Sequence, residues 1–348
     1  MRHRTRPVIA RAASAIARAT LPLFARLDPE LAHDLGLSGL RWLRPMLPTP
    51  RFPQDLVVRC CGLEFAHPIG LAAGFDKNGD YLDALGAMGF SHIELGTVTP
   101  RPQPGNPKPR MFRVPDACAL INRMGFNNKG VDHLVARMSR SRYRGIRGIS
   151  IGKNFDTPIE NAQDDYLACL RKVYPFADYI AVNISSPNTV RLRELQAHDG
   201  LERILGALLH ERPALHQRYG KRVPLLVKVA PDLEPEQIRS LAEDLRSLQV
   251  DGVIATNTST DLRVLGGTPT DMHGGLSGAP LHRLSLRVIT QLRAELGPGF
   301  PIVGVGGIVS ADHALATLRA GANLIQIYTG FAYRGPELLE EIIDALPT

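Results

Sequence analysis

The sequence predicts a (β/α)8 barrel, and two observations carry that prediction. From about residue 55 onward, short apolar runs rich in β-branched residues alternate with longer helical segments, a pattern typical of a parallel sheet covered by helices. Eight such runs fit into the remaining chain, as an eight-stranded barrel requires. A doubly wound sheet is the alternative, but that fold more often has about five or six strands. The predicted strands span 67–75, 92–100, 148–154, 179–187, 225–231, 252–260, 301–308 and 323–331.

Two helices are expected before the barrel. In the first, Ile9, Ile16 and Leu23 are spaced to share one apolar stripe, and Pro22 should kink or end the helix. A basic amphipathic helix of this kind can lie on an anionic membrane surface. A cleaved targeting presequence and a solvated charged face are the alternatives. Residues 1–27 contain no lysine and no acidic residue, and their arginines are Arg2, Arg4, Arg6, Arg11, Arg18 and Arg26.

The second helix has clearer boundaries. Asp28 is a suitable N-cap with Pro29 at the first helical position, and Pro45 and Pro48 end the run. The chain then passes through a short hairpin at 57–65 before the first barrel strand. We therefore predict a helical extension over residues 1–50 and a barrel domain over residues 51–348.

The charge balance and the cysteines exclude several classes of protein. The formal net charge is +7, and the arginines of the first 27 residues leave only about +1 for the rest. A nucleic-acid groove would need basic residues over the whole body, so we expect no nucleic-acid partner. No window approaches 18 uninterrupted apolar residues, which argues against a bilayer-spanning helix. The cysteines lack metal-site spacing, so we predict reduced thiols and no bound metal. They are Cys60, Cys61, Cys118 and Cys169.

Each predicted strand ends in glycine or polar residues, at the edge where a barrel presents its active face. The seventh strand ends in GVGGIVSADHA, a glycine turn followed by a helix that Ser310 can cap. Backbone N–H groups in such a turn can bind phosphate, although a purely structural turn would look the same. Taken together, the eight endings predict a ring of polar groups around one cavity.

Several amides and two lysines indicate what this cavity would hold. Four asparagines fall at strand ends or in the long insertion after the second strand, and their amides match a planar ring of alternating C=O and N–H groups, such as a pyrimidine. Lys77 and Lys228 add positive charge, suited to a ligand carboxylate and to an electron-rich ring. No HExxH motif, strand-end histidine pair or carboxylate pair is present, so we predict redox chemistry carried by a cofactor. The asparagines are Asn122, Asn183, Asn188 and Asn257.

Nine short segments carry a further signal: AAGFDKNG, INRMGFNNKG, IGKN with DTP, NISSPNT, VKVAPD, NTST, GGLSG, GVGGI and IQIYTG. Together they resemble the quinone-dependent (class 2) dihydroorotate dehydrogenases. The resemblance runs in matching order from about residue 28 to the end of the chain. It implies oxidation of dihydroorotate to orotate in pyrimidine biosynthesis, with FMN across the barrel mouth and reoxidation by a membrane quinone.

The resemblance also assigns residues to FMN and to the substrate. The family commonly has asparagine where this chain has Ser150, so the FMN contact there is expected to be lost or bridged by water. The implied FMN contacts are Ala72, Ala73, Gly74, Phe75, Asp76, Thr97, Ser150, Asn183, Lys228, Thr256, Gly278, Gly307, Tyr328 and Thr329. The implied dihydroorotate contacts are Lys77, Asn122, Arg123, Met124, Gly125, Phe126, Asn183, Asn188, Asn257 and Thr258.

Ser186 stands at the family's base position, where it would remove the C5 proton while a hydride leaves C6 for the flavin. A serine is a poor base in water, so it needs a relay, and Thr189 is the expected member. Without the resemblance, a serine turn before proline would be the simpler interpretation of Ser186. Lys228 is expected to stabilise negative charge on the reduced flavin, and Lys77 to anchor the substrate.

The two N-terminal helices match the family's quinone entrance. His33 and Arg113 stand at positions that line its quinone tunnel, although a lone helical histidine is otherwise more often a surface or capping group. We expect a monomeric peripheral protein on the cytoplasmic side of a bacterial inner membrane, bound to anionic lipid through residues 1–45. Two other functions stay open: a flavin barrel that reduces uridine in RNA, and a non-catalytic, membrane-docked barrel that binds a phosphate-bearing ligand.

Overall fold

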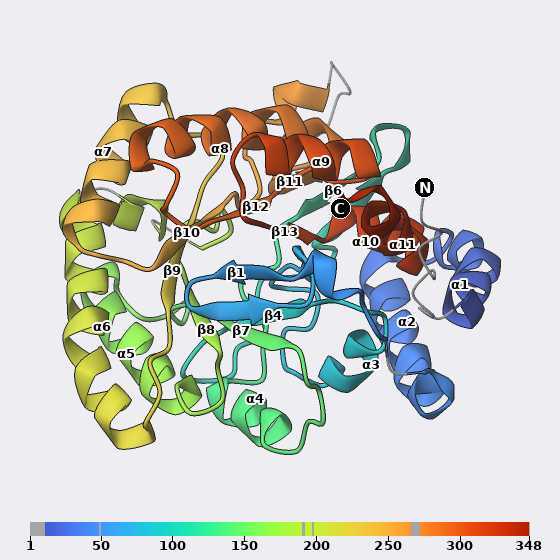
Figure 1. Ribbon diagram of the computed structural model, residues 1–348, viewed down its shortest axis with the longest axis horizontal. Helices are drawn as coiled ribbons and strands as arrows, with labels where there is room; N and C mark the ends of the chain where they lie inside the picture. Colours follow the sequence, from blue (N-terminus) through green and yellow to red (C-terminus); the bar gives the residue numbers. More distant parts are fainter. Residues whose placement is uncertain (1–10, 49, 190–191, 197, 266–271, 348) are drawn as a thin grey trace.

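The structure, a computed structural model, describes residues 11–48, 50–189, 192–196, 198–265 and 272–347. Its centre is a closed barrel of eight parallel strands surrounded by helices (Figure 1), which confirms the predicted fold class. Around the barrel the strands follow the order β10, β12, β13, β3, β4, β7, β8 and β9. Their bounds are β3 Ile69–Leu71, β4 His92–Val98, β7 Ile146–Ile151, β8 Tyr179–Asn183, β9 Leu225–Val229, β10 Gly252–Ala255, β12 Ile302–Val305 and β13 Leu324–Ile327.

All eight strands overlap the predicted runs, but they end sooner. The run at 179–187 contains β8, which already stops at Asn183. Beyond that point polar side chains bond to neighbouring strand ends in place of the ladder, as when Ser185 Oγ donates to the Lys228 carbonyl at 2.6 Å. The polar endings therefore form loops at the rim of the barrel instead of lengthening the sheet.

The helices around the barrel each lay an apolar face on it. In α7, a capping box between Glu234 and Gln237 fixes the start, and Ile238, Leu241 and Leu245 are buried against the barrel. Ser310 caps α9 as predicted, because its hydroxyl accepts from the His313 N–H. The helices are α3 Leu82–Gly86, α4 Val131–Met138, α5 Ala162–Val173, α6 His198–Tyr219, α7 Pro235–Ser247, α8 His282–Leu296, α9 Ala311–Arg319, α10 Thr329–Arg334 and α11 Pro336–Ala345.

Two small sheets lie at opposite ends of the barrel. The predicted hairpin is formed by β1 (Val58–Cys60) and β2 (Leu63–Phe65), and Phe65 packs edge-on against His92 at the start of β4. This hairpin therefore covers the amino-terminal ends of the strands. At the carboxyl-terminal ends lies an antiparallel sheet of β5 (Met111–Val114), β6 (Ala119–Asn122) and β11 (Gly275–Gly278). It forms one wall of the barrel mouth.

The first two helices, α1 (Arg11–Phe24) and α2 (Pro29–Leu43), pack on one flank of the barrel (Figure 1). In α1, Pro22 lies inside the helix, which continues two residues further; Ile9 lies outside the described residues. Asp28 caps α2 as predicted, accepting from the N–H groups of Glu30 and Leu31 at 3.0 Å. Across the residues described, no helix combines the length and apolarity needed to cross a bilayer.

Candidate functional site

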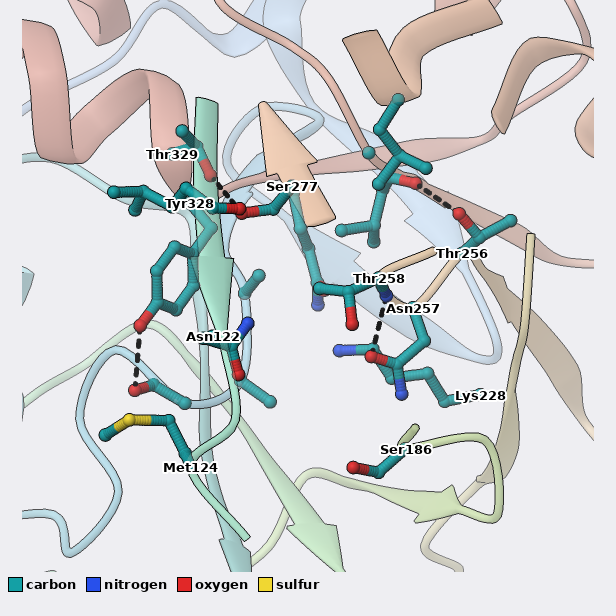
Figure 2. A pocket seen from close by; sticks show the side chains of 18 of the residues that line it. Asn122, Met124, Ser186, Lys228, Thr256, Asn257, Thr258, Ser277, Tyr328 and Thr329 are labelled. Carbon is teal, nitrogen blue, oxygen red and sulfur yellow. Dashed lines mark hydrogen bonds between the residues drawn. The ribbon is translucent and has the colours of Figure 1, made fainter. Parts of the chain in front are cut away.

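The carboxyl-terminal ends of the strands enclose an open cavity of about 1100 Å³ (Figure 2). Its walls come from the ends of the barrel strands, the loops after them and the small sheet of β5, β6 and β11. It is called the front cavity below. The predicted residues that line it are Ala72, Ala73, Gly74, Lys77, Thr97, Asn122, Met124, Gly125, Phe126, Asn183, Ser186, Asn188, Lys228, Thr256, Asn257, Thr258, Gly278, Gly307, Tyr328 and Thr329.

Two glycines in the wall allow only backbone at their positions. Gly278 has φ +99°, and a Cβ there would lie 2.2 Å from the carbonyl oxygen of Cys118. Gly307 has φ +74°, and its Cβ would lie 2.3 Å from the backbone nitrogen of His282. The positive φ excludes a side chain at both positions, and so do the neighbouring backbone atoms of Cys118 and His282. Both glycines line the front cavity, where they present main chain only.

Thr97 and Asn183 form a hydroxyl and amide network in another part of the cavity wall. Thr97 Oγ1 accepts from Asn183 Nδ2 at 2.8 Å and lies 2.9 Å from Ser150 Oγ. Ser150 is fully buried and does not line the cavity. It contacts Thr97, which does line it. At another part of the wall, Thr329 Oγ1 donates to Ser277 Oγ at 2.8 Å.

A buried carboxylate lies beneath the cavity. Lys228 Nζ is 3.5 Å from Glu94 Oε1, and Glu94 is fully buried within the barrel. Glu94 also accepts from Tyr179 at 3.0 Å and from Gln326 Nε2 at 2.9 Å. The buried network therefore holds the Lys228 side chain in place at the floor of the front cavity.

Lys77 lies at the other side of the cavity. Its Nζ donates to the Gly74 carbonyl at 2.9 Å, and burial lowers its pKa to about 8. The neighbouring Asp76 faces away: its carboxylate accepts from the backbone N–H groups of Asn78, Asp80 and Tyr81, which shapes the turn. Burial raises the pKa of Asp76 to about 6. Asp76 does not line the front cavity.

The asparagine side chains are linked across the mouth. Asn188 Nδ2 donates to Asn122 Oδ1 at 3.1 Å, and Asn257 Nδ2 donates to Asn183 Oδ1 at 3.2 Å. Figure 2 shows Asn122 and Asn257 on opposite walls of the same space. This arrangement brings amide donors and acceptors from three segments around one ligand-sized volume: the end of β6, the stretch 183–188 and Asn257.

Ser186 lines the cavity and is 6% exposed. Its Oγ accepts from the Asn188 N–H at 3.3 Å, which is the serine turn that the sequence also allows. Figure 2 shows its side chain directed into the space that Lys228 and Asn257 border. Ser186 therefore both shapes its turn and presents a hydroxyl to a ligand. Thr189 is buried further along the loop and is not part of the cavity wall.

Arg123 is the one predicted substrate contact whose side chain lies away from the cavity. Its guanidinium donates to the Pro109 carbonyl and lies 5.5 Å from the Phe112 ring centroid. The neighbouring Met124, Gly125 and Phe126 do line the wall. The side chain of Arg123 therefore does not reach the front cavity.

A second, largely apolar cavity of about 1540 Å³ lies between α1, α2 and the barrel. It is called the rear cavity below. His33 and Arg113 both line it: His33 Nε2 is 2.8 Å from the Phe75 carbonyl, and Arg113 donates to the Leu27 carbonyl at 2.6 Å. Burial lowers the pKa of His33 to about 4, so its ring is neutral at pH 7. Phe75 lines this cavity and not the front one. The residues shared by both walls are Met111, Leu120 and Tyr328.

Four side chains around the front cavity were missed by sequence reasoning. Ser277 lies in the segment GGLSG and Gln326 in IQIYTG, and each is a polar residue within a strand. Glu94 gave the same signal in the run HIELG. Arg193 gave none, since its contacts are to residues far along the chain.

Comparisons with known proteins agree on one family. A sequence model described as dihydroorotate dehydrogenase matches residues 55–348. A protein named dihydroorotate dehydrogenase (quinone) from Aromatoleum aromaticum is 52% identical over 325 residues, covering 93% of both chains. One of the same name from Pseudomonas aeruginosa is also 52% identical, covering 93% of this chain and 96% of that one. The crystal structure of the Eimeria tenella enzyme with ferulenol superposes with a TM-score of 0.82 at 38% identity, covering 91% of this chain and 90% of that one.

Proposed function

The chain belongs to the dihydroorotate dehydrogenase family, and from that premise we propose that it oxidises dihydroorotate to orotate in pyrimidine biosynthesis with a quinone as electron acceptor. One observation carries this proposal beyond the family. A polar cavity lined by amides, two lysines and a serine adjoins a separate, largely apolar cavity, and the two share part of their walls. A water-soluble substrate and a lipid-soluble oxidant could thus act on one cofactor from two sides.

The cofactor that we propose is FMN. Gly278 and Gly307, which both line the front cavity, would contact its phosphate and ribityl group through their main chain, and Thr97, Asn183 and Lys228 would bond to its ring. When bound, FMN would supply the acceptor for the hydride from C6 of dihydroorotate and the donor for the quinone. Lys228, held by Glu94, would stabilise negative charge at the ring.

The substrate ring would be bound by the amides of Asn122, Asn188 and Asn257, with Lys77 at its carboxylate. The four groups are supported in these roles because they line the same cavity and because Asn122 and Asn188 are already linked. At pH 7 most of Lys77 carries its proton, since its pKa is about 8. A bound carboxylate would keep it protonated to higher pH.

Ser186 would accept the C5 proton of the substrate. A hydroxyl is a weak base, so the proton has to be passed on as it is taken, and Thr189 is the proposed next group in the same loop. The burial of both residues supports this role, because a buried relay excludes competing water. The Asn188 N–H bound to Ser186 Oγ would orient the hydroxyl while leaving its proton free to be handed on.

The rear cavity would bind the quinone, with His33 and Arg113 as its polar groups. Membrane docking is supported by the surface around it. Trp42 and Met46 are 85% and 80% exposed. Among the described residues, the large apolar side chains that are exposed lie in residues 16–46, apart from Val57 and Phe155. We propose that this surface and Arg18 of α1 hold a monomer on the cytoplasmic face of a bacterial inner membrane.

The test is to follow the flavin absorbance of the purified protein. Anaerobic dihydroorotate should bleach the band, and a short-chain quinone should restore it. Bleaching without return on quinone addition would contradict the assigned acceptor. A colourless protein, or one whose band is unaffected by dihydroorotate, would overturn the proposal as a whole. Uridine-containing RNA serves as the comparison substrate and should leave the reduced band unchanged.

A further inference from the structure

We propose that Arg193, paired with Asp232, is a positioning residue that fixes the base loop against the substrate turn. The base loop is residues 184–189, which carry Ser186, and the substrate turn is residues 257–261, which carry Asn257 and Thr258. This inference rests on the proposed function, because it concerns the geometry in which Ser186 meets the substrate.

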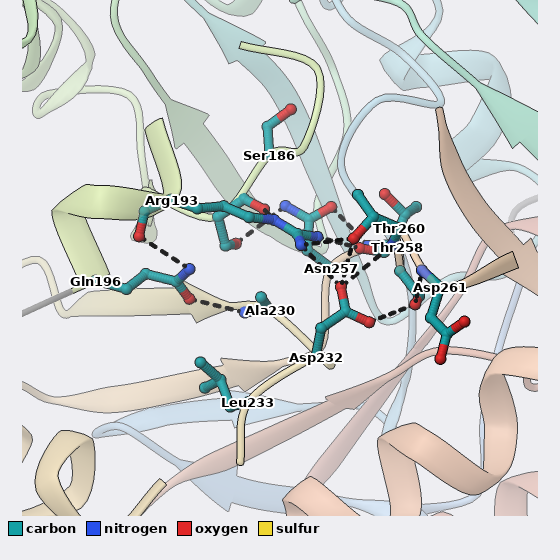
Figure 3. Close-up of polar contacts among 12 residues, drawn as sticks. Ser186, Arg193, Gln196, Ala230, Asp232, Leu233, Asn257, Thr258, Thr260 and Asp261 are labelled. Carbon is teal, nitrogen blue, oxygen red and sulfur yellow. Dashed lines mark hydrogen bonds and ion pairs between the residues drawn. The ribbon is translucent and has the colours of Figure 1, made fainter. Parts of the chain in front are cut away.

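The guanidinium of Arg193 contacts both segments at once (Figure 3). Its Nε donates to the Ser185 carbonyl at 3.2 Å, and its Nη2 donates to the Thr258 carbonyl at 2.9 Å. Ser185 directly precedes Ser186, and Thr258 lines the front cavity. One side chain therefore connects the backbone beside the base to the backbone beside the substrate.

Asp232, just after β9, holds the guanidinium in place. Its Oδ2 accepts from Arg193 Nη1 at 2.8 Å and from the Thr260 N–H at 3.1 Å, while its Oδ1 accepts from Ser259 Oγ. The backbone of Ser259 is in turn bonded in both directions to Leu276 of β11. The Asp232 carboxylate thus orients the arginine and holds the substrate turn, and the Ser259 backbone attaches that turn to β11.

The base loop has supports besides this bridge, and one of them is Asn188 Nδ2, which donates to Asn122 Oδ1 at 3.1 Å. Ser185 Oγ donates to the Lys228 carbonyl at 2.6 Å and accepts from Asn257 Nδ2 at 3.0 Å. The hydrogen bond between Ser186 Oγ and the Asn188 N–H stays inside the loop. Arg193 adds a hydrogen bond at the Ser185 carbonyl, directly before Ser186.

An arginine is suited to this position and a lysine is not. The planar guanidinium offers several donors in fixed directions, and here they meet two carbonyls and a carboxylate at once. The side chains of Arg193 and Asp232 are only 26% and 20% exposed, so water competes weakly for these contacts. The pair differs in this respect from exposed surface ion pairs, which contribute little.

The consequence should appear in proton transfer, because a shift of about 1 Å in a reacting group can cost on the order of 100-fold in rate. In Arg193→Met we expect flavin reduction by saturating dihydroorotate to slow by roughly 10- to 100-fold. The bound flavin, its spectrum and its reoxidation by quinone should stay unchanged. Arg193→Lys should recover only part of the loss, and Asp232→Asn should weaken reduction in the same direction.

The decisive experiment is a double-mutant comparison by anaerobic rapid mixing. If Arg193 acts through Ser186, Arg193→Met should have little further effect in a Ser186→Ala protein. Arg171→Met is the matched control: it removes another two-armed ion pair, to Glu211, on exposed helices away from the cavity, and it should leave reduction unchanged.

Three outcomes would overturn the inference. These are a wild-type reduction rate in Arg193→Met, an equal loss in the Ser186→Ala background, and a loss fully explained by missing flavin. A wild-type protein that dihydroorotate fails to reduce would instead overturn the proposed function, so the two failures are distinguishable.

Discussion

The front and rear cavities share Met111, Leu120 and Tyr328, but the rest of their walls comes mostly from different parts of the chain and differs in polarity. The front cavity is formed by strand ends and the loops after them, and amides, hydroxyls and two ammonium groups line it. The rear cavity is enclosed by α1 and α2, which precede the barrel, and its wall is mainly aliphatic, with His33 and Arg113 among its few polar groups. The difference indicates that the two half-reactions are separable: a change in one wall should affect one half-reaction.

The largest effect is expected from Ser186→Ala. Removing the proposed proton acceptor should slow flavin reduction by about 10²- to 10⁴-fold, the range for general base catalysis, and leave quinone reoxidation intact. Rapid-mixing absorbance measures the two steps separately. Ser186→Cys should retain part of the rate with a pH profile moved to lower pH, because a thiol loses its proton more easily than a hydroxyl. Slow reoxidation in either variant would break the separation of the cavities.

A smaller effect on the opposite side is expected from Gly36→Leu. Gly36 lines the rear cavity, and a Cβ there meets nothing within 4 Å, so leucine would fill the quinone space without strain in α2. The KM for quinone should rise by about tenfold while flavin reduction is unchanged, since about 1.4 kcal/mol of binding corresponds to tenfold. Gly206→Leu on α6 is the matched control, because its Cβ also meets nothing. An unchanged quinone KM in Gly36→Leu would contradict the assignment.

The pH dependence of ligand binding should also differ between the cavities. Burial lowers the pKa of Lys77 to about 8, so its ammonium is present below pH 8 and is lost above it. Orotate affinity should therefore fall by up to about tenfold between pH 8 and pH 9, measured by the flavin spectral shift on titration. Lys77→Met should bind weakly at all pH values and lose this dependence. His33, with a pKa of about 4, is neutral from pH 6 to 9, so quinone affinity should stay flat over that range.

The smallest effect is expected from Ser150→Ala. Ser150 is fully buried and bonds to Thr97 behind the wall, so its loss should cost about 1 kcal/mol of unfolding free energy, the usual net value of one hydrogen bond. Both half-reactions should change by less than about twofold, a limit set by the same small energy. Thermal unfolding and rapid mixing together check this. A large loss of flavin would mean that Ser150 does contact the cofactor.

The fold could be predicted because its signals are local. Each strand is a short, mainly apolar run, and Asp28 with Pro29 marks the start of α2 within a few residues. The polar strand ends were equally visible, and they line the front cavity. The sequence pattern could not predict the directions of adjacent side chains. Phe75 and Asp76 directly follow Gly74, yet Phe75 lines the rear cavity and Asp76 bonds to the backbone of a turn.

The sequence also could not predict contacts between residues that lie far apart in the chain. The pairing of Glu94 with Lys228 joins residues 134 positions apart, and Arg193 reaches Thr258 over 65 positions. No periodicity or spacing reports such contacts, because they arise only when the barrel closes. These residues orient the groups that touch ligands, so the sequence identified the wall of the site better than its supports.

The most direct test of the account is a crystal structure of the protein with orotate bound. We predict that the orotate ring lies in the front cavity among Asn122, Asn188 and Asn257, with Ser186 Oγ beside C5 and Lys77 at the carboxylate. Orotate bound between α1 and α2, or a Ser186 hydroxyl turned away from the ring, would contradict the account.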